Sequence, residues 1–410
     1  MANRNGGFIG TDGLDAPDPP TAVTPTAGSE QVSVAFTAPT DAGTSAITGF
    51  VVQVSTNDTD YSAGSNTGTS SPIVVSSLTN DTAATAKVWA INAYGTSAPS
   101  SASASFTPTL PSRALVFGGS SQAGGDAPVN QVDLFDFSSL GNGTDFGDLS
   151  VERKGAGGTG STTRTLAAGG AEGNSDGDEL ASIDYFSIAS AGNASDFGDL
   201  TNDRYFLAAT GSSTRSVFIG GEDSGNKVNV MDYVTIASLG NATDFGDVAV
   251  RCTQGQGCGS TTRGLHGGGK NLNNSTSNVV EYITIANTGN STDFGDLSSA
   301  RRYNAACSNS TRALFAGGDG SGGDENTIDY FTIASTGNAT DFGNLIAVKN
   351  GLAGTASSTI GCFFGGVSAY TNDCQKVTIG STGNAAYFGE LVGNARGYLG
   401  AASNVHGGIS

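Results

Sequence analysis

Hydrophobic and polar residues alternate with a period of two in four short stretches near the start of the chain. The stretches are 31–37 (QVSVAFT), 47–55 (ITGFVVQVS), 72–78 and 85–92 (TAKVWAIN). Segments rich in Gly, Ser, Thr and Pro separate them. Alternation of this kind predicts strands with one buried face, and several such strands in succession predict a two-sheet β-sandwich. We expect this sandwich to span residues 16–109.

From residue 112 onward the strand pattern recurs as a sequence repeat, with 327–345 (TIDYFTIASTGNATDFGNL) as a representative copy. The copies end in DFG or a variant of it, with phenylalanines at Phe146, Phe197, Phe245, Phe294, Phe342 and Phe388. Their spacing of about 50 residues is typical of propeller blades. Each copy contains a strand ending in Gly-Gly, a variable loop, a second strand, the DFG strand and a strand of small residues. Six copies therefore predict six four-stranded blades.

The two ends of the repeat region complement each other. The first copy begins at 113–119 without the strand of small residues that precedes the other copies, and such a strand follows the last copy at 397–403 (GYLGAAS). One blade built from both ends would leave no open edge inside the ring. We therefore predict an all-β protein, in which the sandwich is followed over 112–410 by a six-bladed β-propeller closed by its C-terminal strand. Residues 1–15 are expected to form a Gly-rich N-terminal arm.

Composition narrows the choice of partners. Only 13% of the residues are charged, 62 are Gly, and the net charge is -19. Because nucleic-acid binding depends on clustered Lys and Arg, we expect no nucleic-acid partner. The chain has no run of about 18 apolar residues, and its first residues lack the basic and apolar segments of a signal peptide. We therefore expect no membrane insertion and synthesis in a cytoplasm.

Charged residues recur in register with the repeat. An acid follows each of the first four DFG motifs and an arginine stands in the next copy, which predicts ion pairs between neighbouring blades. The pairs are Asp148 with Arg164, Asp199 with Arg215, Asp247 with Arg263 and Asp296 with Arg312. Asn344 and Ile360 replace both charges at the next position, so we expect no pair between blades five and six. Closure of the ring would pair Glu390 with Arg113.

Residues suited to catalysis or metal binding are scarce. The two histidines, His266 and His406, occupy unrelated repeat positions, which argues against a histidine metal site or a hydrolytic triad. The acids after DFG share one context in most copies, whereas a catalytic pair needs one special place. We expect no enzymatic activity and no cofactor. The turn GNATDFGD lacks the ligand spacing of a calcium loop, yet its oxygen-rich side chains leave calcium binding open.

The five cysteines show no spacing typical of a zinc site, and free thiols are the simplest interpretation. Cys362 and Cys374 flank one predicted hairpin and could pair. Cys258 and Cys307 occupy equivalent positions in neighbouring strands of small residues. Either a crowded ring of small side chains or a redox pair would explain them.

Variation between the copies is concentrated in the loop after Gly-Gly. In repeat proteins such loops lie on one face and often bind a partner, although drift of solvated loops explains the same variation. The face would be acidic and rich in hydroxyl groups, with one tyrosine as an aromatic platform. The candidate ligand-binding residues are Asp126, Asp178, Glu179, Glu222, Asp223, Asn273, Asp324, Glu325 and Tyr370.

Two resemblances to known folds follow from these segments. Residues 16–109 resemble a bacterial fibronectin type III domain in PPTAVTPTAGSEQVSVAFTAP, SAITGFVVQVS and TAKVWAINAYGTSAPS, with Phe36 in place of the usual Trp and Ala84 in place of the usual corner Tyr. The second change predicts a weaker corner. The Gly-Gly strands, such as 313–318 (ALFAGG), and the tyrosines of the following strands resemble the kelch motif. The Phe of DFG stands where that family has Trp.

The repeats also resemble kelch-like virion proteins of marine tailed phages, particularly cyanophages, in the copies that begin near residues 183, 231, 280 and 328. This resemblance implies a non-enzymatic virion protein of a tail fibre, an appendage or the capsid surface, made in the host cytoplasm. Other virion proteins would bind the arm and the fibronectin domain, and a host-surface polysaccharide or outer-membrane protein would bind the propeller. A secreted bacterial surface adhesin and, less favoured, a carbohydrate-active propeller enzyme are the alternatives.

Overall fold

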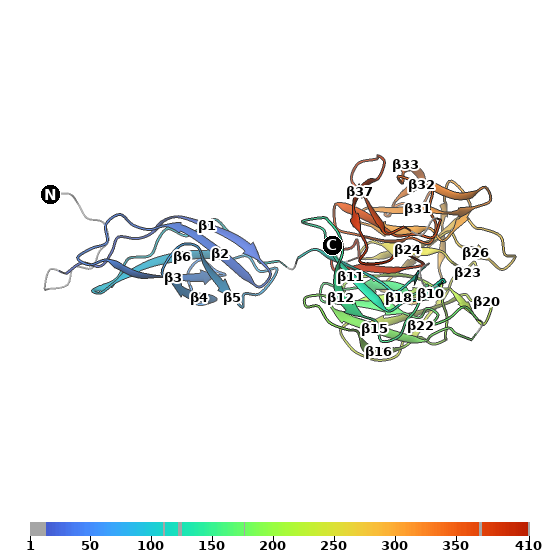
Figure 1. The fold of residues 1–410 in the computed structure, drawn as a ribbon, viewed down its shortest axis with the longest axis horizontal. Coiled ribbons are helices and arrows are strands. Elements are labelled where there is room, and N and C mark those ends of the chain that lie inside the picture. The colour runs from blue at the N-terminus through green and yellow to red at the C-terminus, as the bar shows by residue number, and fades with distance from the viewer. Residues whose placement is uncertain (1–13, 110, 122–124, 176, 369–370, 409–410) are drawn as a thin grey trace. The chain divides into compact units, whose positions relative to one another are not determined.

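A computed structural model describes residues 14–109, 111–121, 125–175, 177–368 and 371–408. The described residues form an all-β structure of antiparallel sheets without a helix. The chain divides into two compact units between Pro111 and Ser112 (Figure 1). Most of the expected N-terminal arm, residues 1–13, lies outside the described residues.

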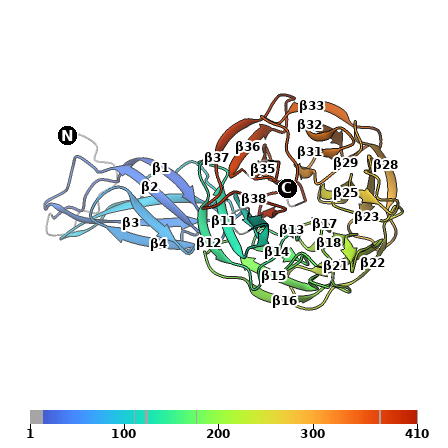
Figure 2. The same ribbon diagram turned by 45° about the vertical axis from the view of Figure 1, so that its right-hand side comes forward.

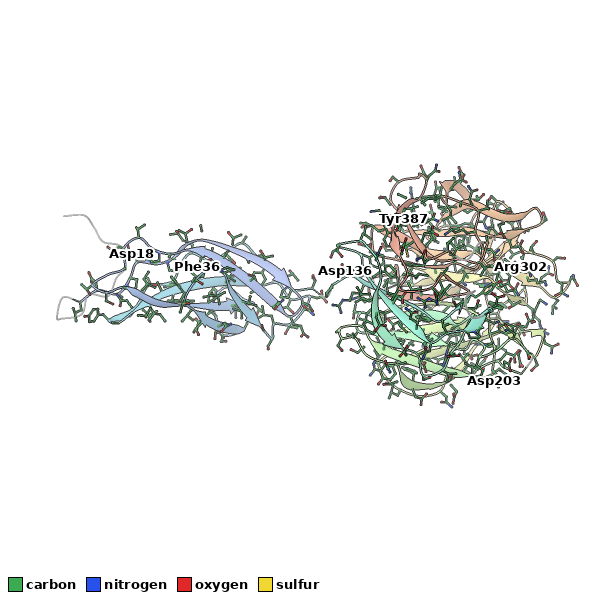
Figure 3. The ribbon with its side chains drawn as sticks, viewed as in Figure 1. Asp18, Phe36, Asp136, Asp203, Arg302 and Tyr387 are labelled. Atoms are coloured by element: carbon green, nitrogen blue, oxygen red, sulfur yellow. The ribbon has the colours of Figure 1, made fainter. Side chains whose placement is uncertain are left out.

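The first unit is a sandwich of two antiparallel sheets. One sheet has the order β1 (Thr21–Gly28), β2 (Gln31–Thr37), β5 (Ile73–Ser76). The other has the order β4 (Gly64–Gly68), β3 (Ile47–Ser55), β6 (Thr85–Asn92), β7 (Gly95–Thr96). Alternate residues of β2 and β6 face the core between the sheets. There Phe36, labelled in Figure 3, packs against Phe50 with ring centroids 4.8 Å apart. The alternating sequence pattern therefore marks the buried face correctly.

The second unit contains six antiparallel sheets, one for each sequence repeat, of which five have four strands and one has a fifth, because β29 (Arg301–Arg302) also pairs with β31 (Arg312–Gly320). Figure 2 shows that they follow one another in chain order around a common centre. Sheet 1 is β12 (Thr144–Asp148), β11 (Gln131–Asp136), β8 (Arg113–Phe117), β39 (Gly400–Ser403); sheet 2 is β13 (Gly157–Gly160), β14 (Arg164–Ala168), β15 (Ser182–Ser187), β16 (Ser195–Asp199); sheet 3 is β17 (Ala208–Gly211), β18 (Arg215–Ile219), β21 (Val230–Thr235), β22 (Thr243–Asp247).

The remaining sheets have the same order of strands. Sheet 4 is β24 (Gln256–Gly259), β25 (Arg263–Gly267), β27 (Val279–Thr284), β28 (Thr292–Asp296); sheet 5 is β30 (Ala305–Ser308), β31 (Arg312–Gly320), β32 (Gly323–Thr332), β33 (Thr340–Asn344); sheet 6 is β34 (Ala353–Ala356), β35 (Ile360–Phe364), β36 (Asp373–Thr378), β37 (Ala386–Glu390). Short strands extend the loops at one end: β9 (Ser120–Ser121), β10 (Ala127–Pro128), β19 (Glu222–Asp223), β20 (Asn226–Lys227), β23 (Cys252–Thr253), β26 (Lys270–Asn271), β29 (Arg301–Arg302) and β38 (Arg396–Gly397).

The first and last strands of the repeat region pair with each other. In sheet 1, β39 runs antiparallel to β8, with Gly400 opposite Phe117 and Ser403 opposite Ala114. The six innermost strands also contact one another in a cycle, from β39 through β13, β17, β24, β30 and β34 and back to β39. Each sheet therefore has two neighbouring sheets, including the first and the sixth.

The DFG strand joins one sheet to the next through its glycine and the residue after it. The backbone N–H of that residue donates to the side-chain oxygen of an Asn in the next repeat at 3.0–3.2 Å. The six pairs are Asp148 with Asn193, Asp199 with Asn241, Asp247 with Asn290, Asp296 with Asn338, Asn344 with Asn384 and Glu390 with Asn142. The regular GNATDFGD sequence thus connects neighbouring sheets, and its Asn residues lie in turns.

The predicted ion pairs between repeats are wrong. Within the described residues, none of the five expected pairs, including Glu390 with Arg113, forms a salt bridge. Each arginine instead points toward the following sheet, where its Nη1 donates to a backbone carbonyl at 2.8–3.0 Å. Those carbonyls belong to Ile188, Ile236, Ile285, Ile333 and Ile379, at or just after the ends of strands.

The junction between sheets that lacks the arginine is also not the one that we predicted. Arg312 reaches Ile379 and so does connect sheets 5 and 6, whereas Ile360 leaves the junction of sheets 6 and 1 without an arginine. There Ile360 packs against an apolar cluster that includes Phe135 and Phe364. The four arginines that follow Arg113 also lie over Tyr185, Tyr233, Tyr282 and Tyr330, at 4.3–5.0 Å from the ring centroids.

Other charged residues form buried ion pairs, each joining the segment that leads into an innermost strand to the third strand of the same sheet. Arg204 lies 3.0 Å from Asp232, Arg301 lies 3.0 Å from Asp329, and all four side chains are inaccessible to solvent. Arg153 with Asp184 repeats the arrangement in sheet 2, and Arg396 with Asp133 repeats it in sheet 1. In sheet 6, Lys349 pairs with Asp373 instead. Sequence analysis did not single out these residues.

All five cysteines are free and buried. Cys362 lies opposite Lys376 in the strand pair, and Cys374 lies opposite Phe364, so the two thiols that could have paired are not cross-strand neighbours. Among the residues that the structure describes, no helical segment has the length and hydropathy that a membrane span needs.

Candidate binding site at the centre of the repeat unit

Six equivalent residues, one at the entry to each innermost strand, form a cyclic chain of backbone hydrogen bonds. Each N–H donates to the carbonyl of the residue in the preceding repeat at 2.7–3.0 Å, and the first donates to the last. This axial ring consists of Gly155, Phe206, Gln254, Tyr303, Gly351 and Tyr398. The backbone at the centre of the unit is therefore fully paired around the circle.

All six residues of the axial ring have a left-handed backbone, with φ between 51° and 66°. Gly155 and Gly351 adopt this conformation without a Cβ penalty. Phe206, Gln254, Tyr303 and Tyr398 adopt it at a cost of order 1–3 kcal/mol each. Since the glycines make the same hydrogen bonds, the backbone of the ring alone does not require the larger side chains.

The three aromatic side chains of the axial ring meet at the centre. Ring centroids lie 5.2 Å apart for Phe206 and Tyr303, 5.3 Å for Phe206 and Tyr398, and 5.0 Å for Tyr303 and Tyr398. Tyr205 packs beside Phe206 at 4.6 Å. All four side chains are only partly buried. We call these four residues the aromatic mouth.

A pocket of about 200 Å³ opens beside the aromatic mouth. All four aromatic residues line it, together with the polar residues Lys154, Asn174, Ser175 and Glu179. Glu179 is only 8% exposed, and one of its carboxylate oxygens accepts a hydrogen bond of 2.7 Å from the N–H of Gly177. The Lys154 ammonium donates to the side-chain oxygen of Asn174.

Acids from several repeats surround the aromatic mouth. Burial raises the pKa of Tyr398, and the carboxylates of Asp126, Asp319 and Asp324 raise it further, against the opposing effect of Arg302. Burial likewise raises the pKa of Tyr303, and Glu222 contributes in the same direction. Burial lowers the pKa of Lys154, and Asp126 and Asp178 oppose this change. Loops that are distant in sequence therefore place their charges around one centre.

The loop residues proposed from sequence fall into two groups. Glu179 lines the pocket, and Asp126, Asp178, Glu222 and Asp324 act on the ionisation of residues around it. Three others lie elsewhere in the structure. Glu325 pairs with Arg301 and accepts from Ser299, Asp223 forms a short strand pair, and Asn273 belongs to a local turn held by Asn271. Tyr370 lies outside the described residues.

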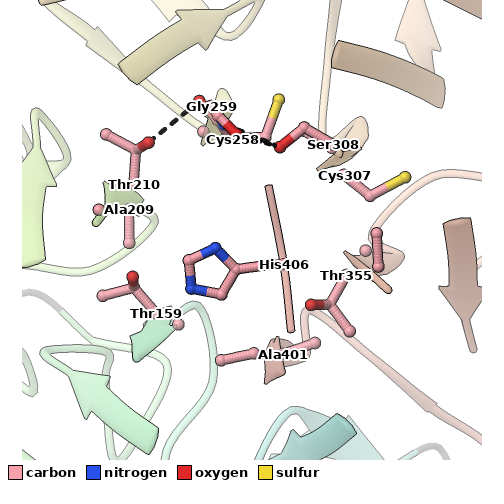
Figure 4. Close-up of a pocket in the computed structure, with 17 residues that line it drawn as sticks. Thr159, Ala209, Thr210, Cys258, Gly259, Cys307, Ser308, Thr355, Ala401 and His406 are labelled. Atoms are coloured by element: carbon pink, nitrogen blue, oxygen red, sulfur yellow. Dashed lines mark hydrogen bonds between the residues drawn. The ribbon is translucent and has the colours of Figure 1, made fainter. Parts of the chain in front are cut away.

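The innermost strands line a second pocket, of about 40 Å³, built from small side chains and His406 (Figure 4). The Nδ1 of His406 accepts from the N–H of Gly408, so its Nε2 carries the proton and donates to the carbonyl of Gly160 at 3.1 Å. The next residue, Gly407, donates to the carbonyl of Ser308 at 2.9 Å. Residues 406–408 thus fill space among the innermost strands.

The cysteines that line or lie near the repeat unit's core are all buried. Burial raises the pKa of the Cys258 thiol to about 12 and raises that of Cys307 well above its ordinary value, so both stay protonated and unreactive. Cys252 lies 3.4 Å from Nε2 of buried His266, and burial raises its pKa too. Within the described part of the chain, no group of three or more His, Cys, Asp or Glu residues could hold a metal ion.

The two histidines predict a pH dependence of stability. Burial lowers the pKa of both His266 and His406 to about 4, from about 6.5 in an unfolded chain. Between these values the unfolded state binds more protons, so stability is complete above pH 6.5 and falls toward pH 4, by up to about 3 kcal/mol per histidine. His266→Phe, which places the side chain of the equivalent Phe315 there, should reduce the slope in denaturant titrations between pH 7 and pH 4. An unchanged slope would contradict the assignment.

Sequence analysis missed the aromatic mouth. The aromatic residues of the mouth could have been found from their place in the repeat, two positions after the buried Arg or the residue that replaces it. Examples are RYF at Phe206, RRY at Tyr303 and RGY at Tyr398. Aligning the copies at this position shows Gly, Phe, Gln, Tyr, Gly and Tyr. The alternation of small and large residues was visible there.

Comparison with known proteins adds no assignment. No protein-family model matches the chain, and no curated protein has a similar sequence. The function must therefore be argued from the geometry of the chain itself.

Proposed function

We propose that residues 112–410 form a closed six-bladed kelch-like β-propeller and that residues 16–109 are a fibronectin type III module. The cyclic contacts of the innermost strands, the axial ring and the pairing of β39 with β8 support closure. The three-stranded and four-stranded sheets of the sandwich support the second assignment. Ala84, at the usual position of the corner tyrosine, is buried and bridges to Phe106.

We further propose that the chain is a non-enzymatic virion protein that presents the propeller for binding to the host surface. The observation that carries this proposal is the aromatic mouth, where partly exposed rings and loops that vary between the repeats surround one pocket. Exposed aromatic and polar groups at a concave site are typical of recognition. The protonated thiols and the scattered histidines favour binding over catalysis.

In this proposal the N-terminal arm and the sandwich attach the chain to other virion proteins of a tail fibre, an appendage or the capsid surface. The resemblance of the repeats to phage virion proteins supports this placement. The net charge of -19 is consistent with a displayed protein whose neighbouring copies repel one another.

Purified particles test the placement. We expect mass spectrometry to find the chain in gradient-purified phage particles, and gold-labelled antibodies against residues 112–410 to decorate the particle surface. Labelling of the producing bacterium's surface with none in the particles would contradict the virion assignment and would indicate a bacterial adhesin. Release of reducing sugars from host envelope material by the purified chain would contradict the non-enzymatic assignment.

A further inference from the structure

We propose that the pocket beside the aromatic mouth binds a single neutral pyranose residue of a surface glycan. This inference rests on the proposed function, since it names the ligand class of the same face.

The walls combine aromatic faces with polar groups. The face of an aromatic ring carries negative potential, and the C–H face of a pyranose presents weakly positive hydrogens, so the two stack favourably. Tyr205, Phe206, Tyr303 and Tyr398 supply such rings to the lining of the pocket. Their tilted and edge-on packing leaves them only partly buried, so their surfaces remain available to a ligand.

The polar residues that line the pocket suit sugar hydroxyl groups. Glu179 and Asn174 bring side-chain oxygens that accept hydrogen bonds, and the Lys154 ammonium is a donor. Each sugar hydroxyl can donate and accept, so it matches this mixture better than a purely apolar ligand does. The carboxylate of Glu179 is held by Gly177 and is almost buried, which fixes its position before a ligand arrives.

The negative charge around the pocket favours neutral over anionic sugars. Asp126, Asp178, Asp319, Asp324 and Glu222 surround the mouth, as their effects on Lys154, Tyr303 and Tyr398 indicate. Arg302 pairs with Asp319 at 2.9 Å, and the positive Lys154, which donates to the neutral Asn174, is outnumbered by the remaining acids. An anionic sugar would meet net repulsion here. A neutral hexose avoids that cost.

Volume limits the ligand to one sugar residue. The pocket of about 200 Å³ is smaller than the roughly 300–1,000 Å³ of sites for drug-sized ligands, which favours one sugar ring over several. A longer glycan would therefore enter by one residue and extend away over the loops.

Backbone strain indicates that the aromatic side chains are retained for a purpose. Phe206, Tyr303 and Tyr398 hold φ values of 51°, 54° and 56° at positions where Gly155 and Gly351 make the same hydrogen bonds without strain. Strain of this kind clusters at ligand sites, where the surrounding structure enforces it. Replacing Phe206 or Tyr398 with glycine should therefore remove the aromatic platform while preserving the axial ring.

Saturation-transfer NMR on the full chain tests the proposal, with methyl β-D-glucopyranoside and methyl β-D-galactopyranoside as probes and methyl β-D-glucuronide as the anionic comparison. We expect transfer to the C–H face of at least one neutral probe, with a dissociation constant of about 1 mM. Phe206→Gly and Tyr398→Gly should weaken binding about tenfold or more without lowering the melting temperature. The matched control Tyr94→Gly removes a half-exposed ring of the sandwich and should leave binding unchanged.

Three results would overturn the proposal: no transfer to either neutral probe at tens of millimolar, equal transfer to the glucuronide, or equal binding by the glycine variants. If those variants unfold, Glu179→Gln keeps the shape of the pocket and provides a second test, with binding reduced several-fold expected and unchanged binding contradictory. The proposed function is tested separately. If the chain binds a sugar but is absent from particles, only the virion assignment is contradicted. If the chain is found in particles but binds neither neutral probe, only the sugar inference is contradicted.

Discussion

Replacing Asp232 with alanine is expected to destabilise the repeat unit by about 3–5 kcal/mol, because the change leaves the buried Arg204 guanidinium without its carboxylate. Both side chains are fully inaccessible to solvent, and their charged atoms lie 3.0 Å apart. The Asp232 carboxylate also accepts from the N–H and the hydroxyl of Thr201, at 2.9 and 2.8 Å. Its loss therefore removes a connection between sheets 2 and 3 in addition to one ion pair.

Denaturant unfolding measures this effect with an internal control. The chain has one tryptophan, Trp89 in β6, so its fluorescence follows the sandwich while circular dichroism follows both units. We expect Asp232→Ala to shift the circular-dichroism transition of the repeat unit and to leave the tryptophan transition in place. Asp319→Ala, which breaks the partly exposed pair with Arg302, should cost under about 1 kcal/mol. Equal costs for the two variants would contradict the role given to burial.

Replacing Gly147 with alanine is expected to destabilise the repeat unit by at least about 1–3 kcal/mol from backbone strain alone. This glycine of the first DFG motif has a φ of 147°, and an added Cβ would lie 2.4 Å from the carbonyl oxygen of Gly192 in the next repeat. The side chain must therefore push sheets 1 and 2 apart or displace the turn that contains Asn193. The steric term adds to the strain.

The matched control lies on the other side of the same contact. A Cβ on Gly192 would meet no atom within 4 Å, so Gly192→Ala should change the stability little. Both variants can be compared by the circular-dichroism transition used for Asp232. If Gly192→Ala destabilised the repeat unit as much as Gly147→Ala, the result would contradict the view that the DFG glycine is needed for the close approach of the two backbones.

Much of the strand pattern could be predicted from the sequence because strand faces alternate locally. The strands at 31–37, 47–55 and 85–92 agree with the structure residue for residue, since Val32, Val34 and Phe36, for example, bury every second position. The stretch predicted over 72–78 is shorter in the structure, where β5 spans Ile73–Ser76. Ends of strands depend on pairing with distant residues, which alternation does not encode.

Partners of charged side chains were harder to predict. The acid after DFG and the arginine of the next copy recur at a fixed spacing, yet spacing does not specify the direction in which a long side chain points. Arg164 turns to the carbonyl of Ile236, which lies beyond the end of its strand and needs a donor. The buried pairs, such as Arg301 with Asp329, join residues of two sequence repeats that meet because the end of one repeat pairs with the first strand of the next.

The aromatic mouth shows the same limit at the candidate site. Phe206, Tyr303 and Tyr398 come from alternate repeats, separated by roughly 95 residues in the chain. Their convergence depends on the left-handed backbone of the axial ring, which no propensity of Phe or Tyr would predict. Sequence reasoning did place the variable loops on a candidate binding face, and five of its proposed residues lie in or around the pocket.

The most direct test of the proposed role is adsorption of the purified, fluorescently labelled full chain to susceptible bacterial cells, measured by flow cytometry. The account predicts saturable adsorption by the unaltered chain and by Tyr94→Gly. It predicts at least about tenfold weaker adsorption by Phe206→Gly and Tyr398→Gly. Equal adsorption by all four proteins would contradict the assignment of the aromatic mouth as the surface that binds the host.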